Sequence, residues 1–225
     1  PALRKPLQQA VDFVVKAQNQ KHGAWDYRPR SNRMDTSVSG WQLMALKSAA
    51  LAGVNVPKRS FELAGIWLDR VSTGSKKGIY GYDRPGHKTP AMVAEGMFSQ
   101  QLLGKYDAKH ERMQESAANV LQNLPKGKSK QNNYYYWYYG CLSMYMHKGE
   151  SWATWNPVMR QILLDRQIKG GSDEGSWDYK HGKHSGAMGR VISTAMAKKP
   201  SDRYQNASEL LRDLDALLTS ISPAT

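Results

Sequence analysis

A short segment that combines a carboxylate, a guanidinium and an imidazole is the first candidate for chemistry in this chain. It reads Asp83-Arg84-Pro85-Gly86-His87. Loops carry binding and catalytic residues more often than buried elements do. Asp83 is therefore a candidate catalytic residue and His87 a candidate ligand-binding residue. Asp-Arg-Pro-Gly is also ordinary turn chemistry, and that interpretation is favoured.

A run of aromatic residues is the second candidate. Tyr134 opens the sequence Tyr-Tyr-Tyr-Trp-Tyr-Tyr-Gly, and a helix is expected from Tyr134 to His147. A helix that is apolar on every side is typically buried, so we expect it to lie at the centre of the molecule. Its aromatic rings would fill a core or line an apolar pocket. The candidate ligand-binding residues are Trp41, Tyr135, Tyr136 and Tyr139.

Metal and disulfide chemistry finds little support in the sequence. Cys141 is the single cysteine, which excludes an internal disulfide and a cysteine-rich zinc module. His147 lies six residues further on and not on the same face of a helix, so the pair does not form a zinc site. We expect Cys141 to be a small buried apolar thiol, and we expect no metal and no cofactor.

Composition limits the classes of protein to consider. With 225 residues the chain can form one domain, or one domain with an appendage. Its net charge of +13 comes mainly from lysine clusters among Gly and Ser, which favours solvated loops and leaves an anionic membrane surface as an alternative. No nucleic-acid-binding motif accompanies the charge.

No apolar run approaches the roughly 20 residues of a membrane span. No signal peptide is visible, which slightly favours the cytoplasm as the location of the protein. Because the sequence opens without Met, export of the protein stays an alternative.

A repeated phrase indicates how these residues are positioned. An apolar residue, a Gln four positions later and then Gly-x-Trp-Asp-Tyr occur at Val14 to Tyr27 and again at Leu163 to Tyr179. A weaker copy at Leu68 to Tyr82 has Tyr80 in place of the Trp. Repetition at this scale is typical of stacked supersecondary units. We expect the Gln amide to bind loose backbone groups at a tight Gly turn, while the aromatic ring covers the junction between units.

The pattern of apolar residues predicts helices in pairs. The expected helices cover 5–20, 35–52, 59–72, 89–103, 109–124, 134–147 and 152–167, and one more begins near Gly189. The fold class is therefore all-α, with about four helical hairpins arranged as a partial ring or an open arc, an α/α toroid. Gly40, Gly96 and Gly140 fall inside helices, where glycine is unfavourable, so close approach of neighbouring groups is expected there.

At the Gln and Gly-x-Trp residues the chain resembles the terpenoid cyclase and protein prenyltransferase α/α-toroid superfamily, whose QW repeat has this form. The stretch from Tyr134 to Gly140, then Trp152-x-x-Trp155-Asn156-Pro157 and Gly175-Ser176-Trp177-Asp178, is similar to the bacterial prenyltransferase/squalene-oxidase repeat subgroup. The resemblance covers roughly residues 5–195. The chain lacks the catalytic motifs of this superfamily. These are the Asp-x-Asp-Asp acid of cyclases, their Asp-Asp-x-x-Asp metal motif and the zinc ligands of prenyltransferases.

The last residues carry a different resemblance. Lys198-Lys-Pro-Ser-Asp-Arg203-Tyr, followed by Ala207-Ser-Glu-Leu210, is similar to the end of a bacterial Ser/Thr protein kinase domain. The catalytic motifs of a kinase are absent, which excludes kinase activity for this chain. We therefore divide the chain into a toroid-like domain, 1–195, and a helical appendage, 196–225.

Three hypotheses about function follow. The first is a non-catalytic repeat module that binds a protein or an apolar ligand in its central groove. The second is a cyclase- or prenyltransferase-like enzyme acting on an isoprenoid, for which Asp35, Asp83 or Glu95 would have to supply the missing acid. The third is a structural remnant of a larger signalling protein.

Overall fold

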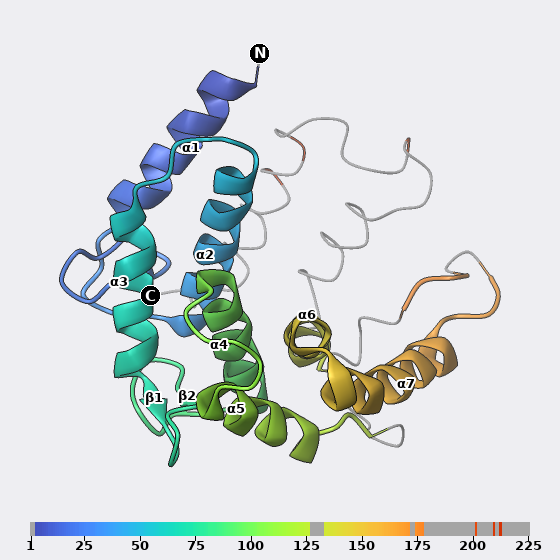
Figure 1. Cartoon of the computed structure of the whole chain (residues 1–225). Helices are drawn as coiled ribbons and strands as arrows, with labels where there is room; N and C mark the ends of the chain where they lie inside the picture. The colour runs from blue at the N-terminus through green and yellow to red at the C-terminus, as the bar shows by residue number, and fades with distance from the viewer. Residues whose placement is uncertain are drawn as a thin grey trace, which may run out of the picture. The chain divides into compact units, whose positions relative to one another are not determined.

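A computed structural model of the chain describes residues 3–126, 133–171 and 174–177, together with Ser201, Glu209 and Arg212. The predicted all-α class is confirmed for this part of the chain. Its helices are α1 (Arg4–Ala17), α2 (Thr36–Leu51), α3 (Lys58–Arg70), α4 (Pro90–Leu103), α5 (Glu111–Gln122), α6 (Tyr134–His147) and α7 (Gly149–Arg166) (Figure 1). The helix expected near Gly189 and the boundary at residue 196 lie outside the described residues. The arrangement of hairpins as a ring or arc stays a prediction.

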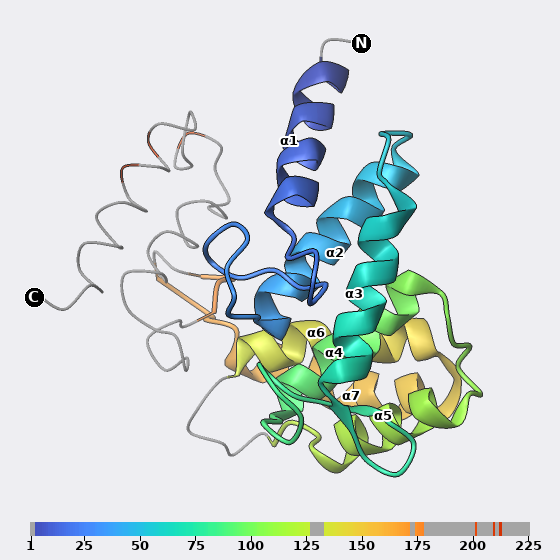
Figure 2. The ribbon, with the colours of Figure 1, turned by 90° about the vertical axis from the view of Figure 1, so that its left-hand side faces the viewer.

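The chain divides into two compact units. One comprises Pro1–Pro125 with Tyr135–Gln161, and the other comprises Lys126–Tyr134 with Ile162–Thr225. In the first unit α2 follows α1 in the opposite direction, and α2 and α3 lie side by side (Figures 1 and 2). Helix α4 packs against α2, α3 and α5. The candidate site belongs entirely to this first unit.

A short hairpin interrupts the helical pattern. Strands β1 (Ser72–Thr73) and β2 (Ile79–Tyr80) pair antiparallel, between the helices expected at 59–72 and 89–103, so the expected helix extended too far at its end. Backbone bonds from Gly81 to Val71 and from Tyr82 to His87 continue the pairing beyond it. These strands could not be predicted, because two residues are too few for an alternating pattern to be visible.

The repeated phrase forms the bonds expected of it. Gln18 Nε2 donates to the carbonyl oxygens of Gly23 (2.9 Å) and Ser60 (3.0 Å), and Trp25 Nε1 donates to Val14 O (2.8 Å). In the second unit, Gln167 donates to the carbonyl oxygen of Gly175 and Trp177 to that of Leu163, both at 2.8 Å. In both copies the tryptophan bonds the carbonyl four residues before the glutamine. The bonds expected of the glutamine amide at the Gly turn are therefore confirmed in both copies, while the covering of a junction by the aromatic ring stays a prediction.

Glycines lie where other groups approach the backbone closely. Gly23 has a φ of +86°, and a Cβ there would collide with the Leu63 carbonyl. Inside helices, a Cβ would meet the Glu95 carboxyl group at Gly40, the Tyr80 ring at Gly96 and the Trp155 ring at Gly140. The predicted close approach is therefore confirmed at all three helical positions.

Among the described helices, the one that is buried along most of its length is α4, whereas α6 was expected to be central and buried. Every residue from Ala91 to Gln100 is buried. Helix α6 buries Tyr136, Trp137 and Tyr139, but leaves Tyr138 and Tyr145 exposed. The expectation that α6 is buried all round was therefore wrong, because α6 packs through one face only.

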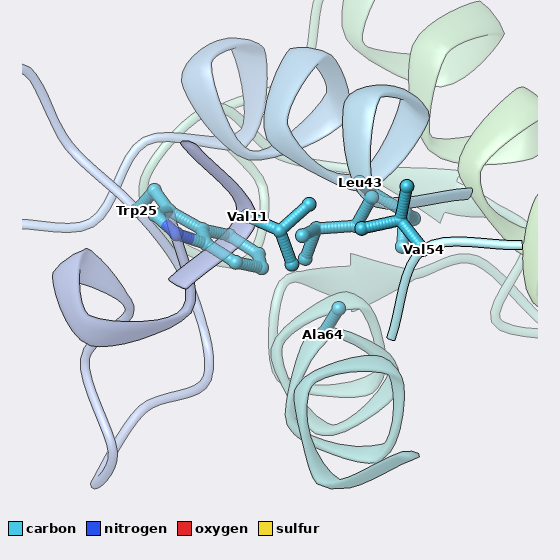
Figure 3. Packing of buried hydrophobic residues seen from close by; sticks show 6 residues of the cluster. Val11, Trp25, Leu43, Val54 and Ala64 are labelled. Carbon is cyan, nitrogen blue, oxygen red and sulfur yellow. The ribbon is translucent and has the colours of Figure 1, made fainter. Parts of the chain in front are cut away.

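A core joins the first three helices. Val11 of α1, Leu43 of α2 and Ala64 of α3 meet around Trp25 and Val54 (Figure 3). Burial of such side chains contributes roughly 25 cal/mol per Å² of apolar surface removed from water. This core holds the Trp25 turn, and with it Asp26 and Tyr27, against the start of α2.

Candidate functional site

An open hollow of about 450 Å³ lies where the Trp25 turn meets α2 and α6. We call it the aromatic hollow. Its aromatic lining consists of Tyr27, Trp41 and Tyr135, and its remaining lining residues among those described are Asp26, Ser37, Val38 and Gln42. It therefore combines ring faces with a carboxylate, a hydroxyl and an amide, which is the usual composition of a small-molecule site.

The aromatic wall is held by contacts between α2 and α6. The Trp41 ring stacks on Tyr138, with centroids 5.5 Å apart, and meets the edge of Tyr139 at 5.8 Å. Tyr139 also contacts Tyr135 edge-on at 5.1 Å. Although it makes these contacts, Trp41 stays 42 % exposed. The rings are fixed in position, and that of Trp41 stays accessible.

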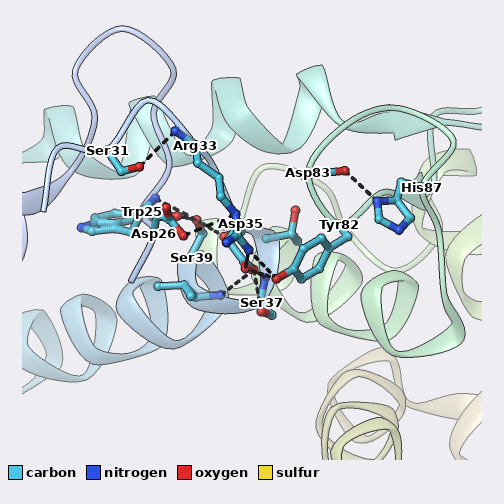
Figure 4. Close-up of polar contacts among 12 residues, drawn as sticks. Trp25, Asp26, Ser31, Arg33, Asp35, Ser37, Ser39, Tyr82, Asp83 and His87 are labelled. Atoms are coloured by element: carbon cyan, nitrogen blue, oxygen red, sulfur yellow. Dashed lines mark hydrogen bonds and ion pairs between the residues drawn. The ribbon is translucent and has the colours of Figure 1, made fainter. Parts of the chain in front are cut away.

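Asp35 begins α2 and has a structural role. Its side chain accepts bonds from the backbone N–H groups of Ser37 (2.8 Å) and Val38 (3.2 Å), as an N-cap does. It also accepts bonds from Tyr82 and from Arg33, which is 3.2 Å away (Figure 4). Burial raises the pKa of Tyr82 to about 12, and the hydrogen bond to Asp35 adds to this. Tyr82 therefore stays neutral and donates to the buried carboxylate.

Glu95 lies behind the hollow, fully buried in α4. Tyr135 OH donates to its Oε2 at 2.7 Å, whereas Oε1 accepts no bond from the described residues. Burial raises the pKa of Glu95 well above its usual range; the hydrogen bond from Tyr135 acts against this, and the negative charge of Asp35 adds to it. The protonated form is favoured. Glu95 is thus a buried acid one side chain away from the hollow.

Asp26 is the carboxylate of the hollow itself. Its side chain is 7 % exposed, and its Oδ1 accepts no hydrogen bond from the described residues. The guanidinium of Arg33 approaches this oxygen to 3.8 Å, lies over the Tyr27 ring at 5.8 Å and also pairs with Asp35 (Figure 4). Arg33 therefore forms ion pairs with both Asp26 and Asp35.

Asp83 and His87 form a pair apart from the hollow. Asp83 Oδ1 lies 2.7 Å from His87 Nδ1, and the bond to His87 lowers the pKa of Asp83 (Figure 4). Gly86 has a φ of +84°, and His87 N donates to Arg84 O, as in a turn. The favoured turn interpretation of this segment is confirmed. The pair lines no part of the hollow.

The structure brings together some of the residues that the sequence singled out. Trp41 and Tyr135 line the hollow, and Tyr139 supports both of them. Tyr136 lies elsewhere, since it is buried and donates to the carbonyl oxygen of Val120. Sequence reasoning missed Asp26, Tyr27 and Arg33. The signal for the first two was present, because Trp-Asp-Tyr recurs unchanged at Trp177 to Tyr179.

Cys141 is half-buried, and its sulfur accepts a bond from Trp155 Nε1 at 3.3 Å. Among the described residues, no group of three or more His, Cys, Asp or Glu side chains is placed to hold a metal ion. In the same part of the chain, no helix is both long and apolar enough to cross a membrane.

The chain matches no family model, no curated protein and no solved structure.

Proposed function

We propose that this chain is a non-catalytic α/α-toroid repeat module that binds a compact ligand with an apolar body in the aromatic hollow. The observation that carries the proposal is Trp41. Its ring is fixed by Tyr138 and Tyr139, yet remains 42 % exposed in a hollow of about 450 Å³. An exposed, rigid aromatic ring beside polar groups is typical of a ligand-binding surface.

The positions of two candidate acids support a binding role over a catalytic one. Asp35 is used as a helix cap and as a partner of Tyr82. Asp83 is paired with His87 in an exposed turn. Both carboxylates therefore already have structural partners. The repeat bonds of Gln18 and Trp25 support the toroid part of the proposal, since the resemblance rests on the same residues.

Saturation-transfer NMR with 3,3-dimethylbutan-1-ol tests this proposal, because its tert-butyl group is compact and apolar and gives one strong signal. We expect transfer to the tert-butyl signal in the natural protein. Val38→Trp would fill the hollow and abolish the transfer. Ile66→Trp adds the same ring on an exposed part of α3 and would leave it unchanged. Equal transfer in both variants would show that the alcohol binds elsewhere, and no transfer in the natural protein would contradict the proposal.

Glu95 supports a second candidate function, an enzyme that acts on an isoprenoid. Burial raises the pKa of its carboxyl group, which accepts a hydrogen bond from Tyr135, a residue that lines the hollow. Incubation with squalene and with geranylgeranyl diphosphate, followed by product analysis, tests this candidate. Product from the natural protein but not from Glu95→Gln would support it. Absence of product from both proteins, or equal turnover by both, would contradict it.

A further inference from the structure

The polar side of the aromatic hollow carries an incompletely paired carboxylate. Asp26 is more than nine-tenths buried, and its Oδ1 accepts no hydrogen bond from the described residues. Its cation among those residues is Arg33, whose Nε lies 3.8 Å away, beyond hydrogen-bonding distance. A buried charge without a bonded partner is costly and is often explained by function. Asp26 therefore places an incompletely paired negative charge directly beside the hollow that it lines.

Among the described residues that line the hollow, Asp26 is the one charged side chain, so the lining carries a negative charge. Among the described residues, Asp26 and Asp35 share Arg33 as their paired cation, so two carboxylates face one guanidinium. This occurs in a chain whose net charge is +13. A cleft that concentrates one sign of charge attracts ligands of the opposite sign. The hollow is thus suited to a cation, although the protein as a whole attracts anions.

The ring faces strengthen this preference. Tyr27, Trp41 and Tyr135 line the same hollow as Asp26, and a cation within about 6 Å of such a ring is stabilised by the π-electrons. Arg33 already illustrates the mode of binding. Its guanidinium lies 5.8 Å from the Tyr27 centroid while it pairs with Asp26. An external ammonium group on Trp41 would make the corresponding contacts from the interior of the hollow.

We propose that the ligand of the aromatic hollow is a small organic cation, an alkylammonium or quaternary ammonium compound. Its charge would lie against Asp26, and its apolar groups would lie against Trp41 and Tyr135. This inference rests on the proposed function, because it specifies the chemical class of ligand at that same site. It requires neither a metal nor a covalent step.

Isothermal titration with choline and with 3,3-dimethylbutan-1-ol tests the charge directly, because the alcohol has the shape of choline without its charge. We expect choline to bind at least about tenfold more tightly, a difference of about 1.4 kcal/mol. Butylammonium, measured in parallel, shows whether a primary or a quaternary group is preferred; either one supports the inference if it exceeds the alcohol.

A pair of matched variants tests whether Asp26 is the residue that recognises the positive charge of choline. Asp26→Asn should remove the preference for choline over the alcohol, whereas Asp12→Asn, which makes the same charge change on exposed α1, should retain it. Circular dichroism establishes that both are folded. Arg33→Gln removes the protein's own cation from Asp26 and should tighten choline binding several-fold. That variant gives a second measurement if Asp26→Asn does not fold.

The outcomes separate this inference from the proposed function. If the alcohol and choline bind the natural protein equally, or if Asp26→Asn keeps the preference, the cation inference is wrong and the binding function stands. If neither compound binds, both are wrong.

Discussion

Glu95 is a fully buried carboxyl group with one hydrogen-bond donor among the described residues. Its Oε2 accepts a bond from Tyr135, and its Oε1 occupies the space that Gly40 leaves by having no Cβ. Because burial favours the neutral form, the folded chain holds a proton that the unfolded chain releases at neutral pH.

The pH dependence of stability follows from this difference. Below the unfolded pKa of about 4.5 the group is protonated in both states and has no effect. Above it, only the unfolded chain ionises, so the free energy of unfolding falls by about 1.4 kcal/mol per pH unit until the folded pKa is passed.

Glu95→Gln removes that ionisation. We therefore expect the variant to gain stability relative to the natural protein as the pH rises from about 4.5 to about 7.5. Urea denaturation at both pH values measures the gain, and Glu150→Gln, at an exposed position of α7, is the control. If the difference in stability between the two proteins does not change with pH, Glu95 is not protonated in the folded state.

Individual elements depend on small residues at defined contacts. Gly96 of α4 faces the Tyr80 ring of β2, whereas a Cβ at Gly65 of α3 would meet only Leu103 Cδ1, at 3.6 Å. Both glycines lie in helices, so alanine has the same intrinsic advantage at each, about 1 kcal/mol. Any difference in stability between the two alanine variants therefore comes from the contacts that the added Cβ makes.

Gly96→Ala should therefore destabilise the protein by about 1–3 kcal/mol through overpacking, while Gly65→Ala should stabilise it by up to about 1 kcal/mol. Thermal unfolding of the two variants checks the prediction. Similar effects of both substitutions would show that α4 does not pack against Tyr80 as described.

The repeat phrase gives a second prediction for elements. Gln18→Ala leaves the carbonyl groups of Gly23 and Ser60 without their amide donor, and should cost about 1–3 kcal/mol. Gln20→Ala, two residues along and exposed, should change stability by less than about 0.5 kcal/mol. Chemical denaturation distinguishes them, and equal losses would refute a special role for Gln18.

Local signals predicted the elements better than the site. Asp35 and Thr89 accept backbone bonds at the starts of α2 and α4, where the expected helices 35–52 and 89–103 begin, because a cap depends only on its nearest neighbours. The hollow depends on α2 meeting α6, far apart along the chain, and no local pattern carries that contact. Asp26 and Arg33 are only seven residues apart, but their pairing depends on the path of the turn between them, which the sequence pattern does not specify.

At the scale of the whole molecule, the net charge of the chain and the charge of the hollow's lining have opposite signs. The chain has a net charge of +13, whereas the one charged side chain among the described lining residues of the hollow is the carboxylate of Asp26. Screening weakens the repulsion of a cation by distant lysines at a Debye length of about 8 Å, while the contact with Asp26 is short-ranged. Choline binding should therefore strengthen, or at least persist, when salt rises from low to physiological concentration, which titration at both salt concentrations measures.

The most direct test of ligand binding in the aromatic hollow is NMR of the ¹⁵N-labelled tryptophan indoles during a choline titration, with Trp41 assigned by Trp41→Phe. We expect the Trp41 N–H signal to shift in a saturable manner. Buried Trp25 and Trp155, whose Nε1 groups are bonded to Val14 and Cys141, should stay in place. A stationary Trp41 signal, or an equal shift of all three, would contradict the assignment of the hollow as the binding site.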